Sequence, residues 1–149
     1  MAGGLYYLGG DFTVNGVNAT VNDNGNGVLI YLSGSSTFNM LGGGNATLSP
    51  AGSYTYSGGV YSNTKYQLTI FQDRSATLNN AWSVKGGSTT TVQGLIYAPR
   101  ASLTFTGSAS AAVGQTLLVN QVSVTGTASL ILSQSLVPVG TQGEVRLVE

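Results

Sequence analysis

Five segments of the chain share one pattern of apolar and polar residues. In each, two apolar residues stand two positions apart with a small polar residue between them, and a glycine follows two positions later. These segments are residues 11–16, 37–42, 81–86, 102–107 and 121–126. Because successive side chains of a strand point to opposite faces, a period of two predicts β-strands. A unit that recurs along a chain is typical of repeats that stack and bury a shared apolar face.

A second apolar segment precedes each alternation and a shorter third one follows its glycine, with Gly- and Asn-rich turns between them. Three short strands in every repeat predict an all-β fold, a right-handed parallel β-helix of about five coils in a single domain, 1–149. The coils are expected at about 5–27, 28–50, 68–93, 94–114 and 115–134, with an insertion at 49–67 and a C-terminal cap or extra strand at 135–149. The alternative is a β-sandwich of hairpins, in which Asn15-Gly16 and Asn24-Gly25 would be turns.

Stacked coils would place equivalent residues in columns. One inner column is expected to hold Phe12, Phe38, Trp82, Leu103 and Val122. A second is expected to hold Val14, Met40, Val84, Phe105 and Val124, and a third Tyr6, Ile30, Ile70, Ile96 and Leu118. The positions between the first two columns are small and polar, as suits the solvent-facing side of a sheet: Thr13, Asn39, Ser83, Thr104 and Ser123.

Charge is sparse, which narrows the possible partners. Charged residues are 7% of the chain, against about 25% in typical domains, and the net charge is zero. This argues against nucleic-acid binding and against an electrostatic membrane anchor, and it favours self-association. The chain has no cysteine and no histidine, which excludes Cys/His metal sites and thiol or imidazole catalysis. No metal and no cofactor are expected.

Tyrosines gather in the insertion and in one outer column. The insertion carries Tyr54, Tyr56, Tyr61 and Tyr66, and it is expected to project from a coil corner. The column holds Tyr7, Tyr31, Phe71 and Tyr97, with Val119 at its end. The candidate ligand- or partner-binding residues are Tyr54, Tyr56, Tyr61, Tyr66, Tyr31, Phe71 and Tyr97. Two alternatives stay open for both sets: the rings could bind sugars or a protein, or the column could be a structural ladder and the insertion could cover the flank of the coils.

Asp73 and Arg74 are adjacent opposite charges that could be read as catalytic. Polysaccharide-cleaving sites need several convergent carboxylates, often with calcium. The acidic residues here are scattered along the chain: Asp11, Asp23, Asp73, Glu144 and Glu149. We therefore expect no catalytic residues, with Asp73 capping a corner through backbone N–H groups and Arg74 lying over the coil. Asp23 among asparagines could contribute oxygens to calcium, but a single carboxylate makes a poor site.

Four short stretches resemble a known family through their residues, their order and their spacing. They are Gly-Gly-Asp-Phe at 9–12, Gly-Val-Leu-Ile-Tyr-Leu at 27–32, Phe-Gln-Asp-Arg-Ser at 71–75 and Gly-Leu-Ile-Tyr-Ala-Pro at 94–99. Over about residues 5–132 the chain resembles the C-terminal repeat region of TadG-like proteins, of the tight-adherence (Flp) pilus assembly group of bacteria. The resemblance implies a membrane-anchored envelope protein with an exported C-terminal part and no enzymatic activity.

The first residues have neither a basic segment nor an apolar core, and the chain has no run of about 18 apolar residues. We therefore expect this chain to be part of a longer secreted protein and to contain no membrane segment of its own, and the resemblance implies that the longer protein is membrane-anchored with this part exported. The predicted location is extracellular, at the cell surface.

The function predicted from these features is that of a non-enzymatic structural or adhesive β-helix module of a pilus-associated envelope protein. Its expected partners are other envelope or pilus proteins, or surface glycans. One alternative is a carbohydrate-binding module that uses the tyrosine-rich insertion. Another is a filament subunit that associates end to end with copies of itself, because a β-helix without end caps leaves strand edges open.

Overall fold

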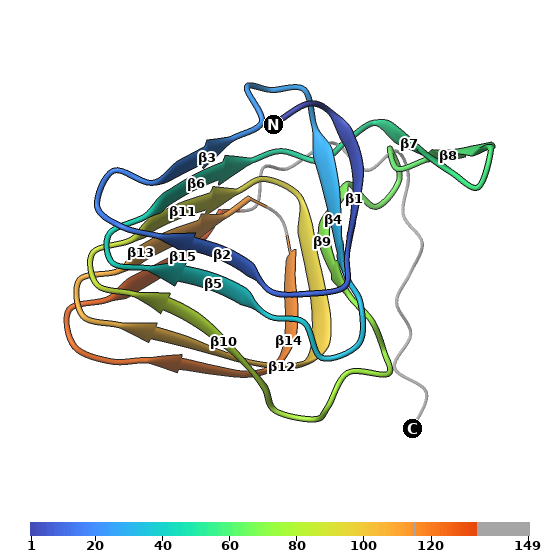
Figure 1. The fold of residues 1–149 in the computed structure, drawn as a ribbon. Coiled ribbons are helices and arrows are strands. Elements are labelled where there is room, and N and C mark those ends of the chain that lie inside the picture. The colour runs from blue at the N-terminus through green and yellow to red at the C-terminus, as the bar shows by residue number, and fades with distance from the viewer. Residues whose placement is uncertain (115, 134–149) are drawn as a thin grey trace, which may run out of the picture.

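The computed structural model describes residues 1–114 and 116–133, so the cap or extra strand expected at 135–149 lies outside the described residues. Throughout the described part the chain is all-β and contains no helix. A helix able to cross a membrane is accordingly absent from these residues. The strands are mostly parallel and form a nearly closed sheet around one apolar core (Figure 1). The predicted all-β, repeat-like architecture is thus confirmed.

The main strands fall into three series, and within a series each strand pairs in parallel with its equivalent in the neighbouring repeat. The first series contains β1 (Gly4–Leu8), β4 (Val28–Leu32) and β9 (Leu68–Gln72). The second contains β2 (Phe12–Asn15), β5 (Phe38–Leu41) and β10 (Asn80–Lys85). The third contains β3 (Thr20–Asn22), β6 (Asn45–Leu48), β11 (Thr89–Val92), β13 (Ser110–Val113) and β15 (Ser129–Leu132). Parallel pairing of this kind contradicts the alternative β-sandwich of hairpins.

Two long strands belong to both the first and the second series. β12 (Leu95–Thr106) pairs with β9 through its first part and with β10 through its second, and β14 (Thr116–Val124) lies along both parts of β12. The sequence predicted two short strands in each of these repeats, so the structure differs here. The chain turns the corner while remaining in the sheet.

Two of the three predicted inner columns are confirmed by the strand register. Phe12 lies opposite Phe38, Trp82 opposite Leu103, and Leu103 opposite Val122. The second column follows in the same way, with its members paired in the order Val14, Met40, Val84, Phe105 and Val124. Its intervening positions also pair as expected, from Thr13 to Ser123.

The third column is confirmed from Tyr6 to Ile96, but its last member is wrong. Leu117, not Leu118, lies opposite Ile96. Leu118 lies opposite Tyr97, so it and not Val119 ends the aromatic column. The physical reason is that residues 117–119 are three apolar residues in a row, so the sequence pattern does not say which of them point inward.

The glycine of each repeat forms the corner between the second and third series. Gly42 has φ 60°, Gly86 has φ 67° and Gly107 has φ 74°. Residues with a Cβ rarely adopt this left-handed backbone conformation. The corners also stack, but a Cβ at Gly86 would lie 3.5 Å from the backbone nitrogen of Gly42, an ordinary van der Waals distance. The positive φ therefore accounts for the glycine at this corner.

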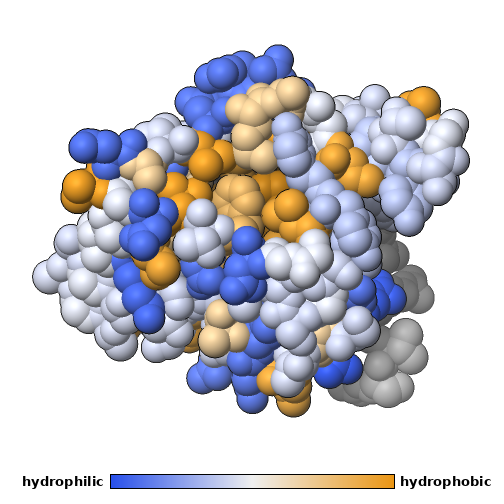
Figure 2. Space-filling view, in the orientation of Figure 1, coloured by the Kyte–Doolittle hydropathy of each residue, from blue (hydrophilic) through white to orange (hydrophobic). Residues whose placement is uncertain are grey.

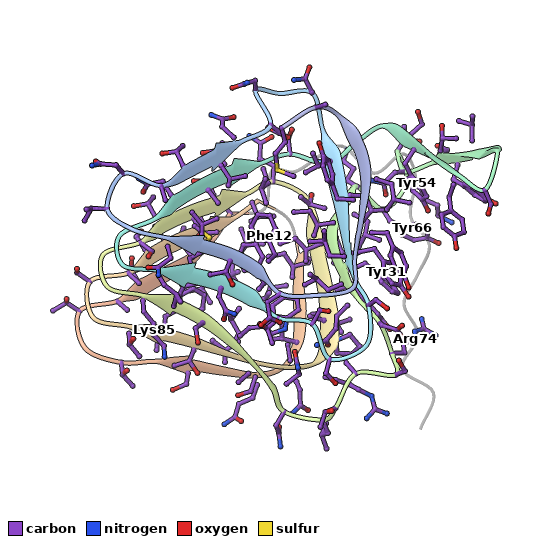
Figure 3. The ribbon with its side chains drawn as sticks, in the orientation of Figure 1. Phe12, Tyr31, Tyr54, Tyr66, Arg74 and Lys85 are labelled. Atoms are coloured by element: carbon purple, nitrogen blue, oxygen red, sulfur yellow. The ribbon has the colours of Figure 1, made fainter. Side chains whose placement is uncertain are left out.

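The core contains the inner columns and one buried polar cluster. Trp82 is buried, and its indole Nε1 donates to Oδ1 of Asn80 at 2.7 Å. Gln72 is buried too, and its Nε2 donates to the same oxygen at 3.1 Å. Phe12 points into the space enclosed by the strands (Figure 3). On the face of the molecule seen in Figure 2, apolar surface lies in the middle and hydrophilic surface surrounds it. No pattern in the sequence predicted the buried amide cluster.

Candidate ligand-binding groove

The predicted aromatic column is an aromatic ladder on the outer side of the first series. It contains Tyr7 of β1, Tyr31 of β4, Phe71 of β9 and Tyr97 of β12. Neighbouring ring centroids are 4.9, 5.2 and 5.1 Å apart, with planes inclined by 10°, 20° and 14°. Adjacent strands of a sheet lie about 4.8 Å apart, so in-register pairing brings flat rings face to face.

Face-to-face stacking limits what the aromatic ladder can bind. Both faces of Tyr31 and both faces of Phe71 are covered by neighbouring rings, so a sugar ring cannot stack on them. Tyr97 stacks on Phe71, and the guanidinium of Arg74 lies 5.5 Å from its ring centroid. Tyr7 is the exception, because it ends the aromatic ladder and is 56% exposed. The geometry favours a structural role for the middle rings and leaves the Tyr7 end open to ligands.

The insertion forms a hairpin of β7 (Ser53–Tyr56) and β8 (Gly59–Ser62), which pair in antiparallel fashion. Its turn residues, Ser57 and Gly58, have φ of 48° and 79°. Positive φ at both central positions is typical of the tight turns that join two strands. The hairpin projects beside β1 and β4, as expected for the insertion (Figure 1).

One face of the hairpin carries three of its tyrosines. Tyr54 lies opposite Tyr61, and Tyr56 lies opposite Gly59, so all four positions share one face. The rings of Tyr54 and Tyr61 stack with centroids 5.7 Å apart. Gly59 leaves room for Tyr61, because a Cβ there would lie 3.2 Å from that ring. The result is a paired aromatic surface with Tyr56 beside it, 53% exposed.

A groove of about 350 Å³ separates the hairpin from the upper end of the aromatic ladder. Its walls are Leu5, Tyr7, Leu29, Tyr31, Tyr54 and Tyr56. Figure 3 shows Tyr54 and Tyr31 on the same side of the molecule, on the hairpin and on the first series respectively. We name this feature the tyrosine groove.

The structure brings together three of the seven candidate residues, Tyr31, Tyr54 and Tyr56, in the walls of the tyrosine groove. Tyr61 is not a wall residue, but its ring stacks on that of Tyr54. Phe71 and Tyr97 lie further along the aromatic ladder, and Tyr66 is 63% exposed with the Lys65 ammonium 5.2 Å from its ring. The candidate set omitted Tyr7, which the column pattern had placed at the end of the ladder.

Hydrogen bonds fix the hydroxyl edge of the aromatic ladder. The Tyr7 hydroxyl lies 2.9 Å from Oγ of Ser33, to which it donates. Burial, followed by the hydrogen bond to Asp73, raises the pKa of Tyr31. The backbone and side chain of Ser75, together with the hydrogen bond from Tyr31, lower the pKa of Asp73. At neutral pH the edge therefore combines the neutral phenol of Tyr31 with an ionised Asp73.

The described carboxylates stabilise corners of the backbone. Asp11 Oδ1 accepts from the backbone N of Thr37 at 2.8 Å, and Asp73 Oδ1 accepts from that of Ser75 at 2.8 Å. Asp23 is buried and accepts from both the N–H and the hydroxyl of Ser49. Within residues 1–114 and 116–133, no three His, Cys, Asp or Glu side chains gather as metal ligands would. The corner-capping geometry expected for Asp73 is present.

No protein family, no curated protein and no solved structure matches this chain. The resemblance to TadG-like proteins stays a prediction from the sequence.

Proposed function

We propose that this chain is a non-enzymatic, extracellular adhesive module that binds carbohydrate in the tyrosine groove. Its scaffold is then a right-handed parallel β-helix with three strands per coil. The three strand series, paired in the same order in successive repeats, support this description. The right hand follows from the general handedness of parallel crossovers.

The observation that carries the proposal is the facing arrangement of hairpin and ladder tyrosines across the tyrosine groove. Its volume of about 350 Å³ lies in the range of small-ligand sites, about 300–1,000 Å³. Tyr56, 53% exposed, and Tyr7, 56% exposed, offer ring surface to the apolar side of a sugar, and their hydroxyls can pair with sugar hydroxyls. Tyrosine also gives large contact area at low entropic cost.

The non-enzymatic part of the proposal is supported by the carboxylates. Asp11, Asp23 and Asp73 each accept backbone N–H groups at separate corners. Two-carboxylate hydrolysis requires a pair of carboxyl groups across one sugar bond. The place of the module in a pilus-associated bacterial envelope protein rests on the sequence resemblance.

Glycan binding by a pair of matched tyrosine variants tests the proposal. Tyr56→Ala removes a ring from the tyrosine groove, and Tyr66→Ala removes a somewhat more exposed ring outside its walls. On an array of bacterial and host-surface glycans, we expect Tyr56→Ala to weaken binding about tenfold, the effect of one stacking contact. Tyr66→Ala should bind like the parent protein. Equal binding by both variants, with unchanged melting temperatures, would refute the groove as the site.

A second candidate function, end-to-end assembly, is favoured by the ends of the strand series. Among the described strands, β1, β2 and β3 each pair with one strand only. At the other end of the described strands, Val122 and Val124 continue the inner columns and are 40% and 45% exposed. If copies stack through these ends, light scattering will show mass that grows with concentration, and Val124→Lys will abolish the growth. A concentration-independent monomer would eliminate this candidate.

A further inference from the structure

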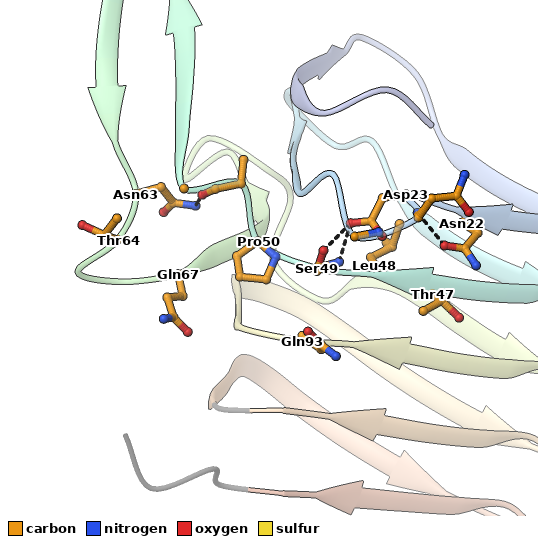
Figure 4. A pocket seen from close by; sticks show the side chains of 14 residues that line it. Asn22, Asp23, Thr47, Leu48, Ser49, Pro50, Asn63, Thr64, Gln67 and Gln93 are labelled. Carbon is orange, nitrogen blue, oxygen red and sulfur yellow. Dashed lines mark hydrogen bonds between the residues drawn. The ribbon is translucent and has the colours of Figure 1, made fainter. Parts of the chain in front are cut away.

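A second, larger hollow lies at the corner where the chain passes from the third series to the first. It has a volume of about 720 Å³ and is formed by the segments after β3, β6 and β11, closed by the chain that follows β8. Figure 4 shows Pro50, Gln93 and Gln67 around it, with Asn63 on the hairpin side. We call it the amide cleft. It shares no wall residue with the tyrosine groove.

The walls of the amide cleft are fixed by hydrogen bonds within the protein. Oδ2 of Asp23 accepts from the backbone N and from Oγ of Ser49, at 2.8 and 2.5 Å, which joins two of the three contributing corners. Asn63 is buried, and its Nδ2 donates to the carbonyls of Ala51 and Leu68, both at 2.8 Å. Its Oδ1 accepts from the backbone N of Leu68 at 2.9 Å. Because these bonds are made without a ligand, the cleft is preorganised.

Three wall side chains keep their hydrogen-bonding capacity free. Among the described residues, the side chains of Asn24, Thr47 and Gln93 have no hydrogen-bond partner, and all three are exposed. Two amides and one hydroxyl can both donate and accept. Among the described residues, the walls of the cleft contain no Lys or Arg, and their one carboxylate, Asp23, is buried and hydrogen-bonded. Pro50 adds an apolar ring to this polar lining.

We propose that the amide cleft binds a neutral saccharide. Sugar hydroxyls donate and accept at once, as the amides and the threonine hydroxyl do, and Pro50 can contact the C–H side of a sugar ring. A phosphorylated or sulfated ligand would find no cation among the described wall residues, and a metal ion would find the Asp23 carboxylate already hydrogen-bonded to Ser49. The volume of about 720 Å³ lies within the range of ligand pockets, about 300–1,000 Å³. This inference does not depend on the tyrosine groove.

The experiment uses the full chain labelled with ¹⁵N and four probes added separately: cellohexaose, mannohexaose, chitohexaose and, as an acidic comparison, an oligogalacturonate. The readout is the NMR signal of the side-chain amides of Asn24 and Gln93, which report on the cleft directly. The variants Gln93→Leu and Thr47→Val remove polar atoms while keeping similar shapes. Thr104→Val is the matched control, because Thr104 faces outward in the second series and lies outside the cleft walls.

We expect at least one neutral hexasaccharide to shift both side-chain amide signals. Gln93→Leu and Thr47→Val should each raise its Kd about fivefold, the effect of one lost hydrogen bond, while Thr104→Val should not change it. Tyr56→Ala should also leave this Kd unchanged, which separates the inference from the proposed function. Three results would overturn it: no shift with any neutral probe, stronger binding of the acidic probe, or shifts confined to the tyrosine groove.

Discussion

Replacing Trp82, the single tryptophan of the chain, tests the arrangement of the core. Trp82 is 1% exposed, lies opposite Leu103 and packs against Phe38 at a centroid distance of 6.1 Å. A buried tryptophan removes about 200 Å² from water, and about 25 cal/mol per Å² gives a transfer free energy near 5 kcal/mol. Part of this transfer free energy is retained, because alanine keeps some apolar contact and neighbouring side chains relax into the vacated space. We therefore expect Trp82→Ala to lower the free energy of unfolding by about 4 kcal/mol.

A smaller change at the same position should cost less. Trp82→Phe keeps the six-membered ring and removes the rest of the indole with its hydrogen bond to Asn80, whose Oδ1 still accepts from Gln72. Because no acceptor is left unpaired but a small cavity remains, this variant should lose about 2 kcal/mol. Val17→Ala, at a position that is 76% exposed, is the control and should change stability by less than about 0.5 kcal/mol.

Urea unfolding followed by far-ultraviolet circular dichroism measures these differences, since both Trp82 variants lack the tryptophan on which fluorescence would rely. The parent protein supplies an independent check through its own emission, which should be blue-shifted and poorly quenched by acrylamide. Emission typical of a solvent-exposed indole, or a loss in Trp82→Ala no larger than in Val17→Ala, would refute the column arrangement.

Two further predictions concern corners of the fold. Burial would raise the pKa of Asp23, but the hydrogen bonds from Ser49 and from two further backbone N–H groups outweigh burial, so the pKa is lowered. The ionised Asp23 therefore stabilises the fold above a pH of about 4. This contribution disappears as the pH falls through the lowered pKa. Melting temperatures at pH 7 and pH 3 should therefore differ more for the parent protein than for Asp23→Asn, and an equal difference would contradict this role. Gly94→Ala should be strongly destabilising, because Gly94 has φ of 88° and a Cβ there would lie 2.2 Å from the carbonyl oxygen of Gln67; a melting temperature within about 2 °C of the parent would show that this corner tolerates a side chain.

The repeated pattern predicted the stacked strands well because burial and backbone conformation act on the same positions. Phe12, Trp82 and Val84 alternate with polar residues, and a glycine follows within four positions. The sequence therefore predicted both the inward-facing side of each strand and the position of the corner after it. Where three apolar residues follow one another, as at 117–119, the inward face was not defined and the prediction was one residue off. Local pattern fixes register only when one face is clearly polar.

The candidate site was predictable in part, for a different reason. The sequence alone shows that the insertion contains four tyrosines. Which of them share a face depends on the hairpin turn at Ser57 and Gly58. The facing wall of the tyrosine groove comes from β1 and β4, distant in the sequence. The amide cleft collects residues from four separate segments, and no local pattern marks such a convergence of ordinary corner residues.

One side chain closes the base of the hairpin and holds its two ends together. Asn63 links the chain entering the hairpin at Ala51 to the chain leaving it at Leu68, and its backbone N donates to Gly52 at 2.9 Å. The ends of any segment placed between Gly52 and Asn63 are therefore held together by Asn63, while β7 also packs against β1. This position is suited to grafting a foreign binding loop, and the stability lost on replacing the native hairpin would measure what its contacts with β1 contribute.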